Sequence, residues 1–127
     1  MGVMFGTSLA NERISRKNGG NGGIVINTAS VAGLIPCKDD RHAPYFVSKH
    51  GVVTLTRAFG TPEVFARDNI RHVCICPFIT ETNMIAEDPA IFEAMVERYG
   101  RDNILNVDKV VDAFTTLVKV SMLILLF

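Results

Sequence analysis

The sequence lacks an excess of charge of either sign. Its 127 residues carry 13 Lys and Arg residues against 13 Asp and Glu residues, which indicates neither a nucleic-acid partner nor an anionic membrane surface. Cysteine is also scarce. Its three residues, an odd number, argue against a disulfide framework, and no Cys/His cluster indicates a metal site. The first residues show no basic segment followed by a long apolar run, so we expect no signal peptide and a cytoplasmic protein.

Long hydrophobic runs are missing as well. The tail 121–127 is apolar but short, and Asp112 and Lys119 interrupt the stretch before it, so no membrane span is expected. Hydrophobic residues make up 48% of the chain and charged residues 20%, as in ordinary soluble proteins. The length allows one small domain, residues 1–127.

Two apolar runs alternate with helical patterns. Residues 23–28 and 70–76 read as short buried strands of the kind found in parallel sheets. Loops are expected over 31–43 and 78–88, and helices over 2–17, 45–59, 62–67, 89–99 and 108–118. The alternation predicts an α/β fold with two parallel strands.

A glycine cluster, Gly19 to Gly23, suggests a phosphate-binding loop at first sight. Such a loop follows a strand and opens a helix. Here the glycines follow a helix and open a strand, so we interpret them as a helix cap and turn.

Tyr45 and Lys49 stand four residues apart at the start of a predicted helix and therefore share a face. A phenol ionises only near pH ~10, and an adjacent cation favours the phenolate. Ser30 lies just past the first strand, at the edge of the sheet where ligands bind in open α/β folds. Tyr45 could exchange a proton with a substrate oxygen while Ser30 hydrogen-bonds it. By spacing alone, a half-buried tyrosine beside a solvated lysine is the commoner explanation.

The surrounding sequence changes that balance. Residues 24–33, Ile-Val-Ile-Asn-Thr-Ala-Ser-Val-Ala-Gly, and residues 44–51, Pro-Tyr-Phe-Val-Ser-Lys-His-Gly, resemble the short-chain dehydrogenase/reductase family. Residues 69–77, Asn-Ile-Arg-His-Val-Cys-Ile-Cys-Pro, look like the strand that follows in that family. The 15-hydroxyprostaglandin dehydrogenase-like branch, with its arthropod alcohol dehydrogenase-like members, is the most similar. The resemblance covers roughly residues 2–118, the C-terminal half of such an enzyme.

The resemblance implies a role for each matching residue. Tyr45 would be the general acid/base, Lys49 would favour its phenolate and hold the nicotinamide ribose hydroxyls, and Ser30 would orient the substrate oxygen. The reaction would be NAD(P)-linked oxidation of a secondary alcohol or reduction of a ketone, with NAD expected and NADP left open. Besides Tyr45 and Lys49, the implied cofactor contacts are Pro77, Ile79, Thr80 and Thr82, with residues 83–105 as a lid over the substrate.

The chain departs from the family in two respects. Phe78 stands where the family has a glycine that approaches the cofactor. The nucleotide-binding half of the family's Rossmann-type, doubly wound fold has no counterpart, so we expect a partial fold with exposed strand edges. The isolated chain is expected to be inactive.

Two other functions remain open. The family dimerises through helices that match residues 2–17 and 45–66, so the chain could be an interaction module that forms a homodimer or pairs with a full-length relative. A serine hydrolase would use Ser30 with His42 or His50, but Thr-Ala-Ser-Val-Ala does not match the Gly-x-Ser-x-Gly nucleophile elbow.

Overall fold

Two parallel strands form the centre of the fold. In this computed structural model, which describes residues 1–38 and 40–120, β1 (Gly23–Thr28) pairs with β2 (Ile70–Ile75) from Gly23↔Ile70 to Thr28↔Ile75. The prediction for β1 is confirmed with the same bounds, and β2 ends one residue earlier than predicted. The α/β class with two parallel strands, a partial Rossmann-type fold, is therefore confirmed.

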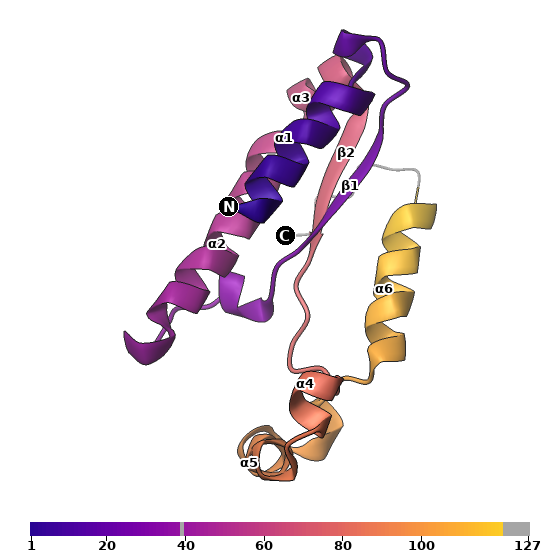
Figure 1. Ribbon diagram of the computed structural model, residues 1–127. Coiled ribbons are helices and arrows are strands. Elements are labelled where there is room, and N and C mark those ends of the chain that lie inside the picture. The colour runs from indigo at the N-terminus through magenta and orange to yellow at the C-terminus, as the bar shows by residue number, and fades with distance from the viewer. Residues whose placement is uncertain (39, 121–127) are drawn as a thin grey trace.

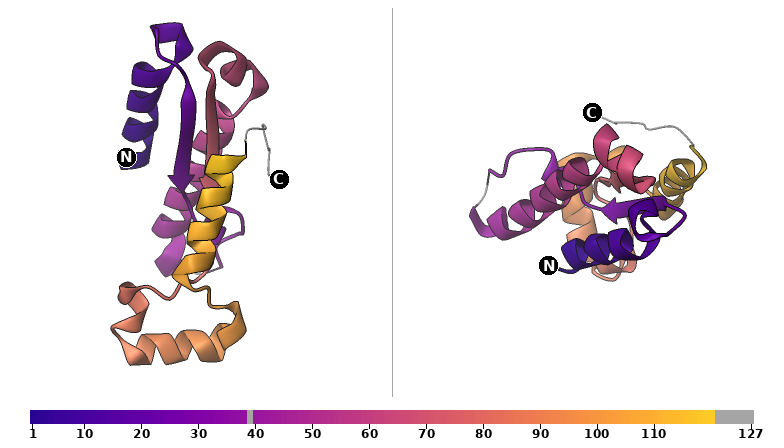
Figure 2. Two further views of the ribbon diagram at one scale, coloured as in Figure 1. Left: turned by 90° about the vertical axis from the view of Figure 1, so that its right-hand side faces the viewer. Right: turned by 90° about the horizontal axis from the view of Figure 1, so that it is seen from above.

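Helices cover both faces of this two-stranded sheet (Figures 1 and 2). Neighbouring residues of a strand point to opposite faces. His72 contacts Asn11 of α1 (Gly2–Ile14) and Phe59 of α2 (Ala43–Phe59). Arg71 instead donates to the Leu117 carbonyl in α6 (Val107–Lys119) and to the Val120 carbonyl after it. The sheet therefore lies between α1 and α2 on one face and α6 on the other.

The core on the α1 and α2 face contains polar side chains as well as apolar ones. Ile70 is 0% exposed. Further along the sheet, buried Asn27 on β1 accepts a hydrogen bond from the Thr7 hydroxyl at 3.4 Å and donates to the Thr56 hydroxyl at 3.0 Å. Because buried polar groups are costly unless paired, this network fixes α1 and α2 against β1.

The glycine cluster is a turn between a helical segment and β1, as interpreted from the sequence. It follows the short 3₁₀ helix η1 (Arg16–Asn18). Gly22 has a φ of 80°, and a Cβ there would lie 2.1 Å from the Asn69 carbonyl oxygen. The turn brings the start of β1 against Asn69, whose carbonyl accepts the Gly23 N–H at 2.9 Å.

Several helix boundaries differ from the predictions. The helix predicted over 2–17 divides at Ser15, because its hydroxyl accepts the Lys17 N–H and donates to Asp68, which holds the backbone extended. The helix predicted over 45–59 starts two residues earlier, at Ala43, and the one over 108–118 extends one residue at each end. The predicted restart after Gly60 is α3 (Pro62–Asp68), where the Thr61 hydroxyl caps Val64.

The predicted loops contain short helices. Residues 31–43 include the 3₁₀ helices η2 (Val31–Gly33) and η3 (Asp40–His42), and residues 78–88 include α4 (Asn83–Ala86). The predicted helix over 89–99 is confirmed as α5 (Pro89–Tyr99), followed by η4 (Arg101–Asn103). Figure 1 shows α4 and α5 beyond the carboxyl ends of the strands, where a lid was expected.

The tail 121–127 lies outside the described residues. Within residues 1–38 and 40–120, no helix combines the length and apolar character needed to cross a membrane.

Candidate active site

Ser30 is fixed at the carboxyl edge of the sheet. It directly follows Ala29, whose N–H donates to the Ile75 carbonyl at 2.8 Å, and the next amide, Val31, donates to the Pro77 carbonyl at 3.0 Å. The Ser30 hydroxyl accepts the Ala32 N–H at 3.2 Å and donates to the Pro77 carbonyl at 3.5 Å, the long limit of a hydrogen bond. Two predicted site residues, Ser30 and Pro77, are thereby brought together.

Lys49 extends from α2 toward the same edge. Its ammonium nitrogen lies 3.4 Å from the Thr28 carbonyl oxygen, at the end of β1, and 5.6 Å from the centre of the Tyr45 ring. The Tyr45 side chain is half exposed, at 49%, which leaves its phenol accessible to a substrate. The lysine charge therefore lies between the end of β1 and the Tyr45 ring, as the i, i+4 spacing predicts.

A residue that the sequence analysis did not single out positions these groups. Gly33 ends η2, and a Cβ at this position would lie 2.6 Å from the Lys49 carbonyl oxygen and 3.0 Å from Val53. Only glycine allows η2, which begins directly after Ser30, to approach the backbone of α2 so closely. The glycine of Val-Ala-Gly, three residues after Ser30, was the available signal.

The segment after β2 connects the edge to residues 83–105, the expected lid. The Ile79 carbonyl accepts the Leu105 N–H at 2.9 Å, and the Leu105 carbonyl accepts the Glu81 N–H at 2.8 Å. The Thr80 hydroxyl donates to the Phe78 carbonyl at 3.0 Å. Thr82 is exposed, and its side chain does not cap α4, which it precedes.

Phe78, at the position where the resemblance expects glycine, contacts α5. Its ring meets the Tyr99 ring of α5 edge to face, with centroids 5.4 Å apart. Arg101, two residues beyond Tyr99, pairs with Glu81 at 3.1 Å. Sequence reasoning missed the role of Tyr99, because nothing in the local pattern links α5 to the end of β2.

The hydrolase arrangement finds no support in this geometry. Both hydrogen bonds of the Ser30 hydroxyl go to backbone groups. A ring nitrogen of His50 lies 3.0 Å from the Phe46 carbonyl of its own helix, on an exposed face of α2. Within the described part of the chain, no group of three or more His, Cys, Asp or Glu residues is arranged to hold a metal ion.

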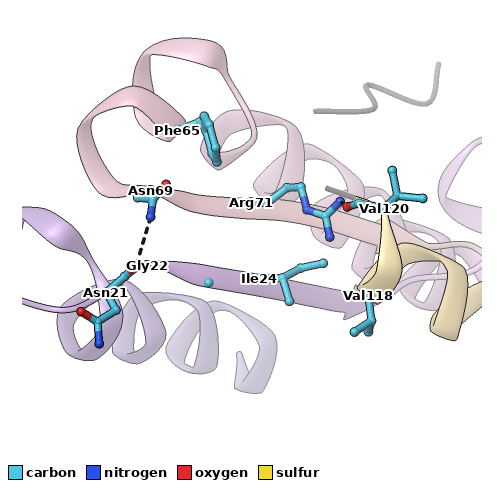
Figure 3. A pocket seen from close by; sticks show the side chains of 9 residues that line it. Asn21, Gly22, Ile24, Phe65, Asn69, Arg71, Val118 and Val120 are labelled. Carbon is cyan, nitrogen blue, oxygen red and sulfur yellow. Dashed lines mark hydrogen bonds between the residues drawn. The ribbon is translucent and has the colours of Figure 1, made fainter. Parts of the chain in front are cut away.

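An open hollow of about 380 Å³ lies elsewhere, near the amino ends of the strands (Figure 3). Gly22, Ile24, Asn69, Arg71 and Val118 are among the residues that line it. Ligands in open α/β sheets bind at the opposite, carboxyl ends. We therefore place the candidate site at the Ser30 edge and not in this hollow.

Comparison with known protein families gives a match over most of the chain. The family described as short chain dehydrogenase matches residues 1–91, a segment that includes both strands, Ser30, Tyr45 and Lys49. The chain belongs to the short-chain dehydrogenase family. The resemblance expected from the sequence is confirmed, and the family is one of oxidoreductases.

Several curated relatives are similar to this chain. The chain is 36% identical over 83 residues to 15-hydroxyprostaglandin dehydrogenase [NAD(+)] of Rattus norvegicus, and 37% identical over 83 residues to that of Homo sapiens. It is 35% identical over 82 residues to alcohol dehydrogenase 1 of Ceratitis capitata. Each match covers 65% of this chain but only 30% or 31% of the relative. The chain thus matches less than a third of the length of these relatives.

Proposed function

We propose that this chain supplies the acid/base half of an NAD-linked short-chain dehydrogenase that oxidises a secondary alcohol or reduces a ketone. The observation that supports the proposal is that Ser30 follows β1 and that Lys49, whose ammonium lies 5.6 Å from the centre of the Tyr45 ring, reaches the same end of the strand. Ser30 and Lys49 are both anchored there by backbone carbonyl groups, at Pro77 and Thr28.

The residues divide the chemistry among them. In alcohol oxidation, the phenolate of Tyr45 accepts the hydroxyl proton of the substrate, and in ketone reduction the phenol returns a proton to the oxygen. The Ser30 hydroxyl hydrogen-bonds that oxygen and sets its distance from Tyr45. The Lys49 charge stabilises the phenolate. A bound nicotinamide nucleotide would supply the hydride acceptor or donor.

One end of such a cofactor would be held by this chain. The Lys49 ammonium, which lies at the end of β1, would bind the ribose hydroxyls, and the segment that begins at Pro77, next to Ser30, would contact the nicotinamide. A pyrophosphate needs glycines at a strand-to-helix turn, but in the described ranges the glycine cluster precedes β1. NAD is the cofactor we favour, because the prostaglandin dehydrogenase relatives carry NAD(+) in their names.

A fusion protein tests the proposed dehydrogenase function. Residues 1–120 would be fused to the amino-terminal half of the Ceratitis capitata alcohol dehydrogenase, and NADH binding and alcohol oxidation would be measured for the fusion and for the isolated chain. We expect the fusion to bind NADH and turn over alcohol and the isolated chain to do neither. Micromolar NADH binding with alcohol oxidation by the isolated chain would contradict the proposal that this chain supplies only the acid/base half. A folded fusion without turnover would contradict the proposed dehydrogenase function.

An interaction module is the second candidate. The observation that favours it is exposed apolar surface on the two helices expected to dimerise, where the Phe5 side chain of α1 is 66% exposed and Val47 of α2 is 72% exposed. Light scattering of the chain, alone and mixed with a full-length relative, tests this function. A monomer under both conditions would exclude it.

A further inference from the structure

Two cysteine thiols meet on one face at the end of β2. Cys74 lies within the strand and Cys76 directly after it, and residues two apart on a strand point to the same face. Their sulfur atoms are 3.8 Å apart, and both side chains are half buried. The third cysteine, Cys37, lies in the segment between η2 and η3.

The backbone allows these sulfurs to bond. Two residues of extended strand span roughly 6.6 Å, inside the upper limit of about 6.8 Å for the Cα separation of a disulfide. The sulfurs must approach from 3.8 Å to about 2.05 Å, a closure of less than 2 Å. Cys74 is paired with Asn27 in the ladder, whereas Cys76 lies past the last pair, Thr28↔Ile75. Cys76 is therefore the residue that moves.

We propose that Cys74 and Cys76 form a redox modification site, which a hydroperoxide closes to an intramolecular disulfide. The peroxide transfers one oxygen to the Cys76 sulfur, which becomes a sulfenic acid while the O–O bond breaks and the hydroperoxide is reduced to the alcohol, or to water if it is hydrogen peroxide. The Cys74 sulfur then attacks the Cys76 sulfur, the S–S bond forms, and the S–O bond breaks with loss of water. The dithiol loses two electrons and the peroxide gains them.

The surroundings of Cys74 determine when the site closes. Burial, followed by the neighbouring Cys76, raises the pKa of the Cys74 thiol to about 11, and the Thr56 hydroxyl and the Arg57 charge of α2 oppose this shift with smaller effects. Because the thiolate is the attacking form, closure is slow at neutral pH and accelerates as the pH rises. The pair therefore stays reduced until Cys76 is oxidised, in keeping with the transient disulfides of reducing compartments.

Closure disturbs the candidate site through Pro77. This residue follows Cys76, and its carbonyl accepts hydrogen bonds from the Val31 amide and the Ser30 hydroxyl. When Cys76 moves toward Cys74, that carbonyl shifts and the two bonds weaken. The oxidised chain thus holds Ser30 less firmly. This consequence concerns structure and does not rest on the proposed function.

Mass spectrometry of the full chain tests the modification. The chain would be treated with hydrogen peroxide, denatured in acid, alkylated and digested with trypsin, which separates residues 72–98 from residues 18–38, the peptide of Cys37. We expect peptide 72–98 to be unalkylated and lighter by two hydrogen atoms, and peptide 18–38 to be alkylated. Peptide 72–98 also contains Met84 and Met95, whose sulfoxides would add oxygen without bearing on the thiols. Two alkyl groups on this peptide, oxygen located on Cys74 or Cys76 by fragmentation, or a cross-link to Cys37 would overturn the proposal.

Variants and amide exchange test its specificity and its consequence. Cys37→Ser should leave the closure unchanged, and Cys76→Ser should abolish it while far-UV circular dichroism shows the same fold. Peroxide should accelerate hydrogen exchange at the Val31 amide in the natural chain and not in Cys76→Ser. Equal exchange in the oxidised and reduced chains would overturn the connection to Ser30.

Discussion

Replacing Gly33 by alanine should separate the two halves of the candidate site. The new Cβ would lie 2.6 Å from the Lys49 carbonyl oxygen and 2.8 Å from its carbon. Both are backbone atoms inside α2, so neither can rotate away. Overpacking of this kind costs about 1–3 kcal/mol, since either η2 or α2 must shift.

Gly51 provides the matched control. It lies two residues beyond Lys49 in the same helix, and a Cβ there meets no atom within 4 Å. Alanine in a helix interior is more favourable than glycine by about 0.5–1 kcal/mol. Gly51→Ala should therefore stabilise the chain while Gly33→Ala destabilises it, with a difference of about 1.5–4 kcal/mol between them.

Urea unfolding followed by far-UV circular dichroism measures the free energy of unfolding of both variants. In the fused protein, alcohol turnover should also fall in Gly33→Ala and not in Gly51→Ala, because displaced catalytic groups lose rate steeply. Equal stability of the two variants would refute the argument that η2 packs directly on the Lys49 backbone.

Three further predictions concern the packing around the sheet. Asn27→Ala should lower the free energy of unfolding by about 1–3 kcal/mol, measured by urea unfolding, because its two buried hydroxyl partners lose a hydrogen bond; no change would show that the network contributes nothing. Asp68 has its pKa lowered from 3.8 to about 2, chiefly by the hydrogen bond from Arg67. The ionised Asp68 carboxylate therefore contributes its full stabilisation above pH 3.8, and this stabilisation is lost as the pH falls toward 2. The difference in urea midpoint between the natural chain and Asp68→Asn should narrow between pH 3.8 and 2, and a constant difference would contradict the lowered pKa of Asp68. Phe78→Gly removes the contact with Tyr99, worth about 0.5–1.5 kcal/mol beyond buried area, and should speed tryptic cleavage after residue 98; unchanged cleavage would mean that the ring pair does not hold α5.

The arrangement of the strands followed directly from local sequence. Residues 23–28 are a continuous apolar run bounded by turn residues, and Pro77 limits the second strand, so both were predictable to within one residue. Thr61 followed by Pro62 likewise marked the start of α3. The interruption of the first helix was not predictable, because Ser15 leaves the helix to bond Asp68, which is distant in sequence.

For the candidate site, the sequence predicted where its residues stand on the secondary structure but not the contacts that hold them. The spacing of Tyr45 and Lys49 placed both on one helix face, and Ser30 followed a strand. The tight contact of Gly33 with α2 and the ring pair of Phe78 and Tyr99 depend on tertiary packing, which no local pattern encodes. The proximity of the Cys74 and Cys76 sulfurs follows from strand alternation, but their link to Ser30 through Pro77 needed the structure.

Turnover of the fused protein with each tyrosine replaced tests the acid/base role most directly. Tyr45 and Tyr99 are the two tyrosines of the chain, and phenylalanine keeps the ring of each while removing its hydroxyl. We predict that Tyr45→Phe lowers kcat by about 10²–10⁴-fold with the fold intact, as expected for loss of a positioned acid/base, while Tyr99→Phe keeps turnover near that of the parent. Near-full turnover of Tyr45→Phe, or an equal loss in both variants, would contradict the assignment of Tyr45 as the proton-transfer residue.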